Sequence, residues 1–137
     1  TYIGHPTACA ASLAVVNKLV GHDLVNRSRF MGEKLQDALS DAFGQHPHIG
    51  DIRGRGLFRG IEIVKDRETK APFSPELKIN KKIKNAASDA GLFCYPMGGT
   101  IDGTKGDHIL LAPPFILEDA HIDEITGKLA KAFDSVL

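Results

Sequence analysis

The stretch HIGDIRGRGLFRGIEIV, residues 48–64, decides the fold of this chain. Before it, apolar residues recur with the spacing of helices, whereas inside it glycines alternate with β-branched residues. Gly54 and Gly56 stand near its centre, where a chain that reverses direction favours residues without a side chain. The stretch therefore predicts two short strands that pass into each other around these glycines.

Two helices are expected before this stretch. Pro6 suits the first turn of a helix, and residues 6–20 carry a single charged side chain, that of Lys18. A helix so apolar is normally covered on most sides. The second expected helix spans about residues 23–43 and ends at Gly44. Its inward face is expected to be Leu24, Met31, Leu35, Ala38 and Ala42.

A helix, two strands and a last helix are expected after residue 64. Ser74 and Pro75 are a good N-cap and first position for the helix, and Gly91 ends it. The segments LFCYPM (92–97) and HILLAPPF (108–115) predict strands joined by a glycine-rich loop, and the last helix is expected at about 118–136. This element order predicts an α+β fold with a small antiparallel-type sheet of about four short strands covered by helices.

Charge and composition exclude some classes of partner. Seventeen basic residues balance 17 acidic ones, which argues against a nucleic acid as the main partner. No apolar run reaches the roughly 18 to 20 residues of a membrane span. Cys9 and Cys94 lie among apolar residues without metal-site spacing, so we expect reduced core thiols and a cytoplasmic protein.

The ionisable residues form no complete catalytic set. A lysine that forms a Schiff base needs a dry pocket or a neighbouring cation. Lys65 in VKDRETK and Lys105 in DGTKGD lie beside carboxylates, so both are expected to be surface charges. The histidines and cysteines have no metal-ligand spacing, so no metal site is expected.

Four segments together resemble a known family. TYIGHPTACAASLAVV (1–16), GDIRGRGLFRGIEIV (50–64), GLFCYP (91–96) and HILLAPPFILEDAHIDEI (108–125) occur in the order seen at the C-terminal end of class III pyridoxal-phosphate-dependent aminotransferases. The resemblance, which is to the omega-amino acid and amine:pyruvate members, implies a fold-type-I enzyme whose large domain carries the Schiff-base lysine. We therefore expect residues 1–21 to form an interdomain helix and a cofactor-phosphate turn, and residues 22–137 the C-terminal small domain. The large cofactor-binding domain is expected upstream of Thr1, so that this piece alone is inactive.

The resemblance also implies roles for individual residues. Thr1 matches a threonine that hydrogen-bonds the cofactor phosphate of the neighbouring subunit, which implies a homodimer. Tyr95 and Leu110 occupy positions where family members place an arginine that binds a substrate carboxylate. Because neither is an arginine, we expect an omega-amine or a β- or ω-amino acid as donor and a small keto acid as acceptor, with Tyr95 against the substrate. Arg53 and Arg55 are expected to form structural ion pairs or backbone hydrogen bonds.

Two other functions remain open at this stage. Aminomutases and decarboxylases share the scaffold, and a fold alone does not fix the reaction. A stand-alone binding or structural module is the third possibility, which an open reading frame extending upstream of Thr1 would exclude.

Overall fold

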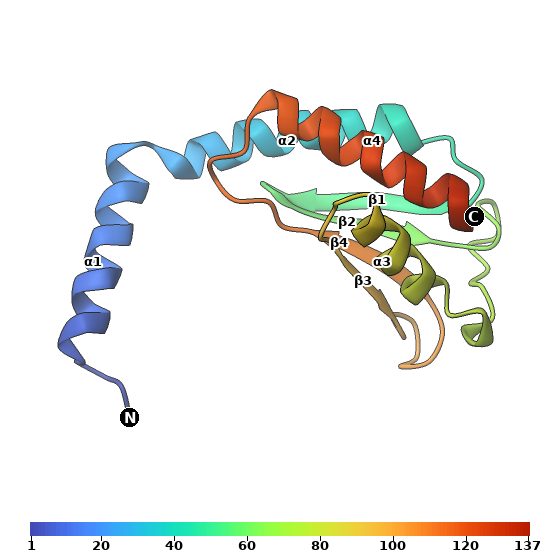
Figure 1. Ribbon diagram of the computed structural model, residues 1–137, viewed down its shortest axis with the longest axis horizontal. Helices are drawn as coiled ribbons and strands as arrows, with labels where there is room; N and C mark the ends of the chain where they lie inside the picture. Colours follow the sequence, from blue (N-terminus) through green and yellow to red (C-terminus); the bar gives the residue numbers. More distant parts are fainter.

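The computed structural model describes residues 1–137 and has an α+β fold (Figure 1). Its elements are α1 (Pro6–Gly21), α2 (Leu24–Phe43), β1 (Ile49–Arg55), β2 (Phe58–Ile63), a 3₁₀ turn η1 (Pro75–Leu77), α3 (Ile79–Asp89), β3 (Tyr95–Gly98), β4 (Asp107–Leu111) and α4 (Asp119–Val136). The expected fold class and the expected order of helices and strands are confirmed.

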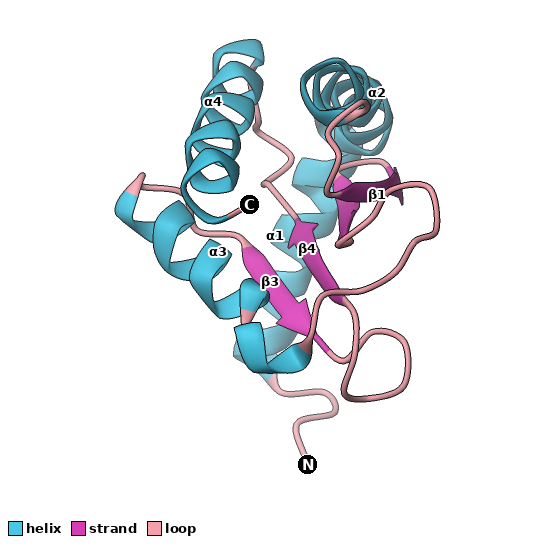
Figure 2. Ribbon diagram, turned by 90° about the vertical axis from the view of Figure 1, so that its right-hand side faces the viewer, coloured by secondary structure: helices cyan, strands magenta, loops and turns pink.

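The four strands form one sheet in the order β1-β2-β4-β3, and every neighbouring pair is antiparallel. Helices α2, α3 and α4 gather on one side of this sheet, and the other side is left open (Figure 2). Because side chains alternate along a strand, Ile61 and Ile63 point to the helices together with their β4 neighbour Ile109. The core is a cluster of Met31, Leu35, Leu39, Phe43, Ile49, Leu57, Ile61, Ile63, Ile79, Ile83, Ile109, Leu111, Leu117, Ile122, Leu129 and Phe133.

Helix α2 packs very closely on the turn of the β1–β2 hairpin. A Cβ atom placed on Gly32 would lie 2.1 Å from the carbonyl oxygen of Gly56, so no larger residue fits there. Gly56 itself has φ +55°, which favours glycine. The buried stripe of α2 includes Leu39 and Phe43, whereas Ala42, which was expected to point inward, is exposed. The large apolar side chains recur every four residues, and this spacing determines which face of α2 is buried, whereas the small alanine does not.

The helix that was expected to have Ser74 as its N-cap begins at Ile79, five residues after Ser74. Residues Pro75–Leu77 form only a 3₁₀ turn, Lys78 has φ +51°, and α3 starts at Ile79. The carboxylate of Asp107 in β4 accepts the backbone N–H of Asn80 at 3.3 Å, so the cap of α3 comes from another strand. Burial raises the pKa of the Asp107 carboxyl, and the hydrogen bond from Asn80 opposes this. The expected start was wrong because a tertiary contact replaced the local cap.

Helix α1 stands away from the rest of the chain. It has no buried residue, and it meets α2 at an angle of 64° (Figure 1). Cys9 is exposed, so the expectation of a core thiol is wrong for this residue, because α1 has no cover in this chain. Cys94 is half-buried, and burial raises the pKa of its thiol.

No single helix is both long and apolar enough to cross a membrane, and α1 and α2 meet that criterion only when the bent pair is taken together.

Candidate functional site

The open face of the sheet brings Tyr95 and Leu110 together. They are ladder partners of β3 and β4, and they line one hollow of about 370 Å³. We call this hollow, lined by Phe58, Phe93, Cys94, Tyr95, Leu110 and Ala112, the apolar hollow. The aromatic ring of Phe58 comes from β2, so three neighbouring strands contribute to its floor.

The apolar hollow holds no charged side chain. Apart from the Cys94 thiol, the Tyr95 hydroxyl is the one polar side-chain group of its lining, and Tyr95 is 59% exposed. A phenol can donate one hydrogen bond but cannot hold a carboxylate with two parallel bonds, as an arginine does. The hollow is therefore suited to the apolar body of a small molecule rather than to its anionic end.

The open face becomes charged towards β1. Arg53 donates to Asp51 at 2.7 Å and to Glu62 at 3.1 Å, which confirms the ion pairs expected for it. The hydrogen bonds that Arg53 donates to these two carboxylates raise the pKa of its guanidinium. Arg55 differs, because its side chain has no ion pair or hydrogen bond in this chain. The structural partner expected for Arg55 is therefore not found within this chain.

Thr1 lies at the far end of α1, in a turn that leads into Pro6. The His5 N–H donates to the Tyr2 carbonyl at 3.1 Å, and Gly4 has φ +75°, so the backbone turns just ahead of the helix. The Thr1 side chain is exposed and has no partner in this chain, so its hydroxyl is free to donate to a phosphate oxygen. The next lysine or arginine is Lys18. The turn of Thr1 therefore offers a free hydroxyl donor and contains no lysine or arginine.

The structure does not bring Thr1 and Tyr95 together. The N-terminus and the sheet lie at opposite ends of the molecule (Figure 1). Neither residue is near a lysine in a dry pocket: Lys65 and Lys105 are exposed, as expected for surface charges. No three His, Cys, Asp or Glu side chains are close enough to share a metal ion.

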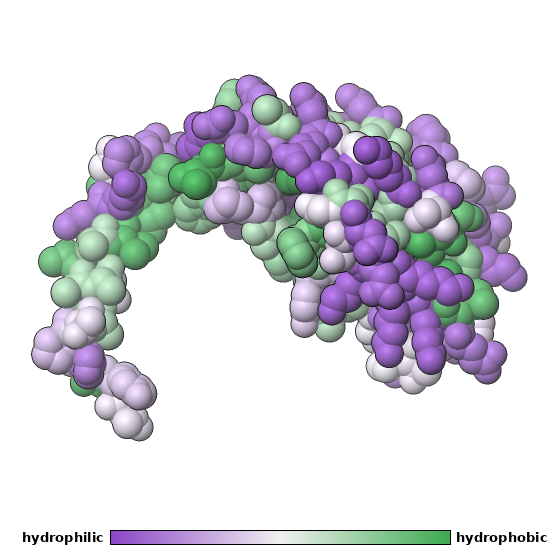
Figure 3. Space-filling model, viewed as in Figure 1, coloured by the Kyte–Doolittle hydropathy of each residue, from purple (hydrophilic) through white to green (hydrophobic).

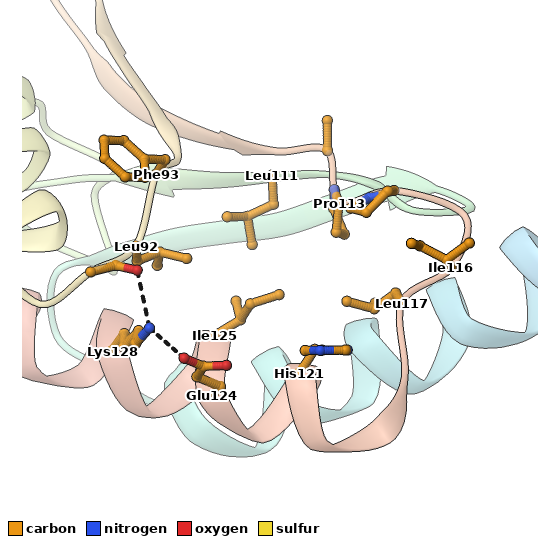
Figure 4. A pocket seen from close by; sticks show the side chains of 13 residues that line it. Leu92, Phe93, Leu111, Pro113, Ile116, Leu117, His121, Glu124, Ile125 and Lys128 are labelled. Carbon is orange, nitrogen blue, oxygen red and sulfur yellow. Dashed lines mark hydrogen bonds and ion pairs between the residues drawn. The ribbon is translucent and has the colours of Figure 1, made fainter.

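A second and larger hollow, of about 460 Å³, lies between α4 and the loops that precede β3 and α4 (Figure 4). We call it the α4 hollow. Its polar edge is Lys128, which donates to the Gly91 carbonyl at 3.0 Å and pairs with Glu124. Hydrogen bonding from Lys128 lowers the pKa of the Glu124 carboxyl. Phe93 and Ala112 line both hollows, which are therefore neighbours.

Two arginines that were not among the expected site residues donate hydrogen bonds to backbone carbonyls of the β1–β2 hairpin, of α2 and of the loop before α4. Arg59 is only 7% exposed and donates to the carbonyls of Gly32 at 2.7 Å and Gly54 at 2.9 Å. Arg27 donates to two carbonyls of the loop before α4. The sequence could have indicated that Arg59 is buried, because this residue lies on the same face of its strand as Ile61 and Ile63. It could not have indicated the contacts of Arg27, whose partners are 88 and 90 residues away.

Comparison with known proteins identifies the family. The model of the family "Aminotransferase class-III" matches residues 1–133. An uncharacterized aminotransferase of Schizosaccharomyces pombe is 48% identical over 137 residues, which are 100% of this chain and 30% of that protein. The taurine–pyruvate aminotransferase of Bilophila wadsworthia is 38% identical over 99% of this chain and 29% of its own length.

A solved structure agrees with these relatives. The omega-aminotransferase of Paracoccus denitrificans superimposes with a TM-score of 0.87 at 36% identity, over 97% of this chain and 28% of that one. The chain thus spans less than a third of the proteins that it matches. Its whole length, however, follows one family in both sequence and fold. The chain therefore belongs to the class III aminotransferases.

Proposed function

We propose that this chain is the C-terminal part of a pyridoxal-phosphate-dependent transaminase. The parent enzyme moves an amino group from an omega-amine, or from a β- or ω-amino acid, to a small keto acid. The observation that carries the donor class is the apolar hollow, where Tyr95 and Leu110 stand side by side without a cation. A donor whose reacting end bears no carboxylate is matched by such a lining, because a buried carboxylate without a partner is costly.

Each residue of the hollow has a physical task in this proposal. Phe58 and Leu110 contact the apolar body of the donor and exclude water from it. The Tyr95 hydroxyl donates a hydrogen bond to a polar atom of the donor or acceptor. Residues 22–137 act as the C-terminal small domain, and residues 1–21 as the interdomain helix with its phosphate turn.

The cofactor is held mainly by residues outside this chain. Pyridoxal phosphate, when bound, supplies the electron sink that stabilises negative charge on the reacting carbon. From this chain Thr1 contributes a hydroxyl donor to the phosphate of the neighbouring subunit, which makes the parent enzyme a homodimer. No lysine of this chain is placed to carry the cofactor, so residues 1–137 alone are inactive.

Amine transfer is tested on the full-length protein with pyridoxal phosphate, a panel of amine donors and pyruvate. We expect alanine and the matching carbonyl product in equal amounts, without release of carbon dioxide. Carbon dioxide release would favour the decarboxylase, and an isomerised amino acid without alanine would favour the aminomutase. Absence of any reaction would reject the proposed function.

The role of Tyr95 has its own test. Tyr95→Arg places a guanidinium in the apolar hollow, so it should raise kcat/KM for an α-carboxylated donor relative to the simple amine by about tenfold or more. Met97→Arg is the matched control, because Met97 lies on the same strand and face, one step further from the hollow. Equal effects of the two substitutions would contradict a substrate contact at Tyr95.

A further inference from the structure

The loop between β4 and α4, residues 112–118, is tied to the start of α2 by Arg27. The Arg27 Nε donates to the Phe115 carbonyl at 3.1 Å, and its Nη2 donates to the Leu117 carbonyl at 2.5 Å. Two adjacent residues of the loop are prolines, which have no N–H to donate. Between residues 112 and 117 the one backbone hydrogen bond within the loop runs from the Leu117 N–H to the Pro114 carbonyl. Arg27 is thus the main polar tether of this loop.

The tethered loop is a wall of both hollows. Its first residue, Ala112, lines the apolar hollow, and Pro113, Ile116 and Leu117 line the α4 hollow (Figure 4). Leu117 is 4% exposed and anchors the loop in the core, whereas Ile116 is 71% exposed. A shift of the loop therefore changes the shape of the hollow that contains Tyr95.

The tether lies directly beside the joint between α1 and α2. Asp23, between the two helices, has φ +49°, and its carboxylate accepts a hydrogen bond from Asn26 instead of capping α2. The Arg27 N–H donates to the Asp23 carbonyl at 3.1 Å, so Arg27 belongs to the first turn after the joint. The loop before α4 lies beside the first part of α2, although the two segments are far apart in the sequence (Figure 1). The tether is therefore made by α2 and not by α1.

We propose that Arg27 is a positioning residue that keeps the β4–α4 loop on α2 and so fixes the wall of the apolar hollow. The inference rests on the proposed function for its consequence, which is discrimination between amine donors of different size. A planar guanidinium can reach two carbonyls at once, whereas the ammonium of a lysine is a compact point charge on a flexible stem. Bonds from a charged donor are also the stronger ones.

Hydrogen exchange tests the tether without any enzymatic assay. In Arg27→Met, the amide of Leu117, which donates to the Pro114 carbonyl, should exchange about tenfold faster, because the closed loop loses two charge-assisted hydrogen bonds. Arg27→Lys should give a smaller increase. Arg29→Met is the matched control, since Arg29 is exposed on the same helix and should leave the loop unchanged. Equal exchange in Arg27→Met and Arg29→Met would overturn the proposal.

Donor discrimination in the full-length enzyme tests the consequence. The quantity to measure is the ratio of kcat/KM for a bulky arylalkylamine to that for a small alkylamine, because the fraction of folded enzyme cancels in this ratio. We expect Arg27→Met to move the ratio towards one by about tenfold, Arg27→Lys to move it less, and Arg29→Met to leave it unchanged. An unchanged ratio alongside faster loop exchange would reduce Arg27 to a purely structural tether and overturn the positioning role.

The two tests keep the proposals apart. Inactivity of the wild-type enzyme towards every amine would reject the proposed function, and the exchange experiment would still decide whether Arg27 holds the loop. A normal wild-type activity with an unchanged donor ratio would reject only the role of Arg27.

Discussion

Arg27 and Arg59 each connect separate elements of this domain through hydrogen bonds to backbone carbonyls. Arg59 occupies a position on β2 where the alternation predicts an apolar residue, and it is buried without a carboxylate partner. Its bonds go to two backbone carbonyls and to the amide of Gln36 at 3.0 Å. Burial lowers the pKa of its guanidinium, although Glu33 and Asp37 act in the opposite direction. The charge is tolerated because carbonyl dipoles of α2 and β1 solvate it.

Replacement of Arg59 should destabilise the domain strongly. Arg59→Met keeps much of the side-chain volume but removes the buried guanidinium bonds to the carbonyls of Gly32 and Gly54, so we expect a loss of about 2–4 kcal/mol in the free energy of unfolding. Arg55→Met, on the same hairpin, should change it by less than about 0.5 kcal/mol because Arg55 is exposed and unpaired. Urea unfolding of both variants measures the difference, and similar midpoints would contradict the account of Arg59.

For single residues, the sequence predicted contacts between residues that are close together in the chain. The ion pair of Arg53 with Asp51 follows from their spacing of two along one strand. The neighbouring positions of Tyr95 and Leu110 required the register of β3 on β4, which an eight-residue loop leaves undetermined. The roles of Thr1 and Tyr95 stay predictions, since both depend on a cofactor and substrate bound by other parts of the enzyme.

Helices and strands could be predicted where the periodic pattern of apolar residues extended over many residues and where nearby residues marked the ends of the element. The end of α2 and the β1–β2 hairpin follow from the change in period at residues 48–64 and from the glycines there. The start of α3 did not follow, because Asp107 supplies its cap from a distant strand. The loop before α4 could not be placed either, since its tether to Arg27 joins segments at opposite ends of the sequence.

The turn between α2 and β1 contains a titratable contact. The His46 Nδ1 accepts the His48 N–H at 3.1 Å, and the His46 ring lies 5.9 Å from that of Phe133. Burial lowers the pKa of His46, and the nearby His48 lowers it further, whereas Asp134 on α4 acts in the opposite direction. A proton on Nδ1 would remove the acceptor of this turn, so the folded state favours the neutral ring.

Acidification should therefore weaken this turn. Because the pKa of His46 is lower in the folded than in the unfolded chain, the unfolded chain binds more protons over the interval between the two values. The stabilisation is present above the ordinary value of 6.5 and is lost as the pH falls through the lowered folded value. His46→Asn keeps an acceptor but does not titrate, so it should remove this component from the pH dependence of the urea midpoint. His22→Asn replaces an exposed histidine and is the control, so it should retain the wild-type pH dependence of the urea midpoint.

The whole molecule is an arch rather than a closed body. Helices α2, α3 and α4 bury the core against the sheet, while α1 extends from one end of the arch without burying a residue (Figure 3). Its exposed side chains include Leu13, Val16 and Val20, which are 62%, 51% and 77% exposed. The composition of α1 alone predicted a helix that needs a cover, and the proposed large domain is the part that would supply it. The bend between α1 and α2 follows Gly21, and the domain boundary expected at residues 21 and 22 stays a prediction.

Exposure of α1 has a consequence for residues 1–137 in isolation. A contiguous apolar surface of several valines and a leucine favours association, so the isolated chain should form dimers or larger species as its concentration rises. Leu13→Lys combined with Val16→Lys places two charges on this surface and should restore a monomer. Thr7→Lys combined with Ala11→Lys adds the same charge on the other side of the helix and is the matched control. Light scattering coupled to size exclusion over a dilution series gives the mass of each species. If the wild-type chain stayed monomeric throughout, α1 would need no cover, and the assignment of residues 1–21 to a contact with another domain would lose its physical basis.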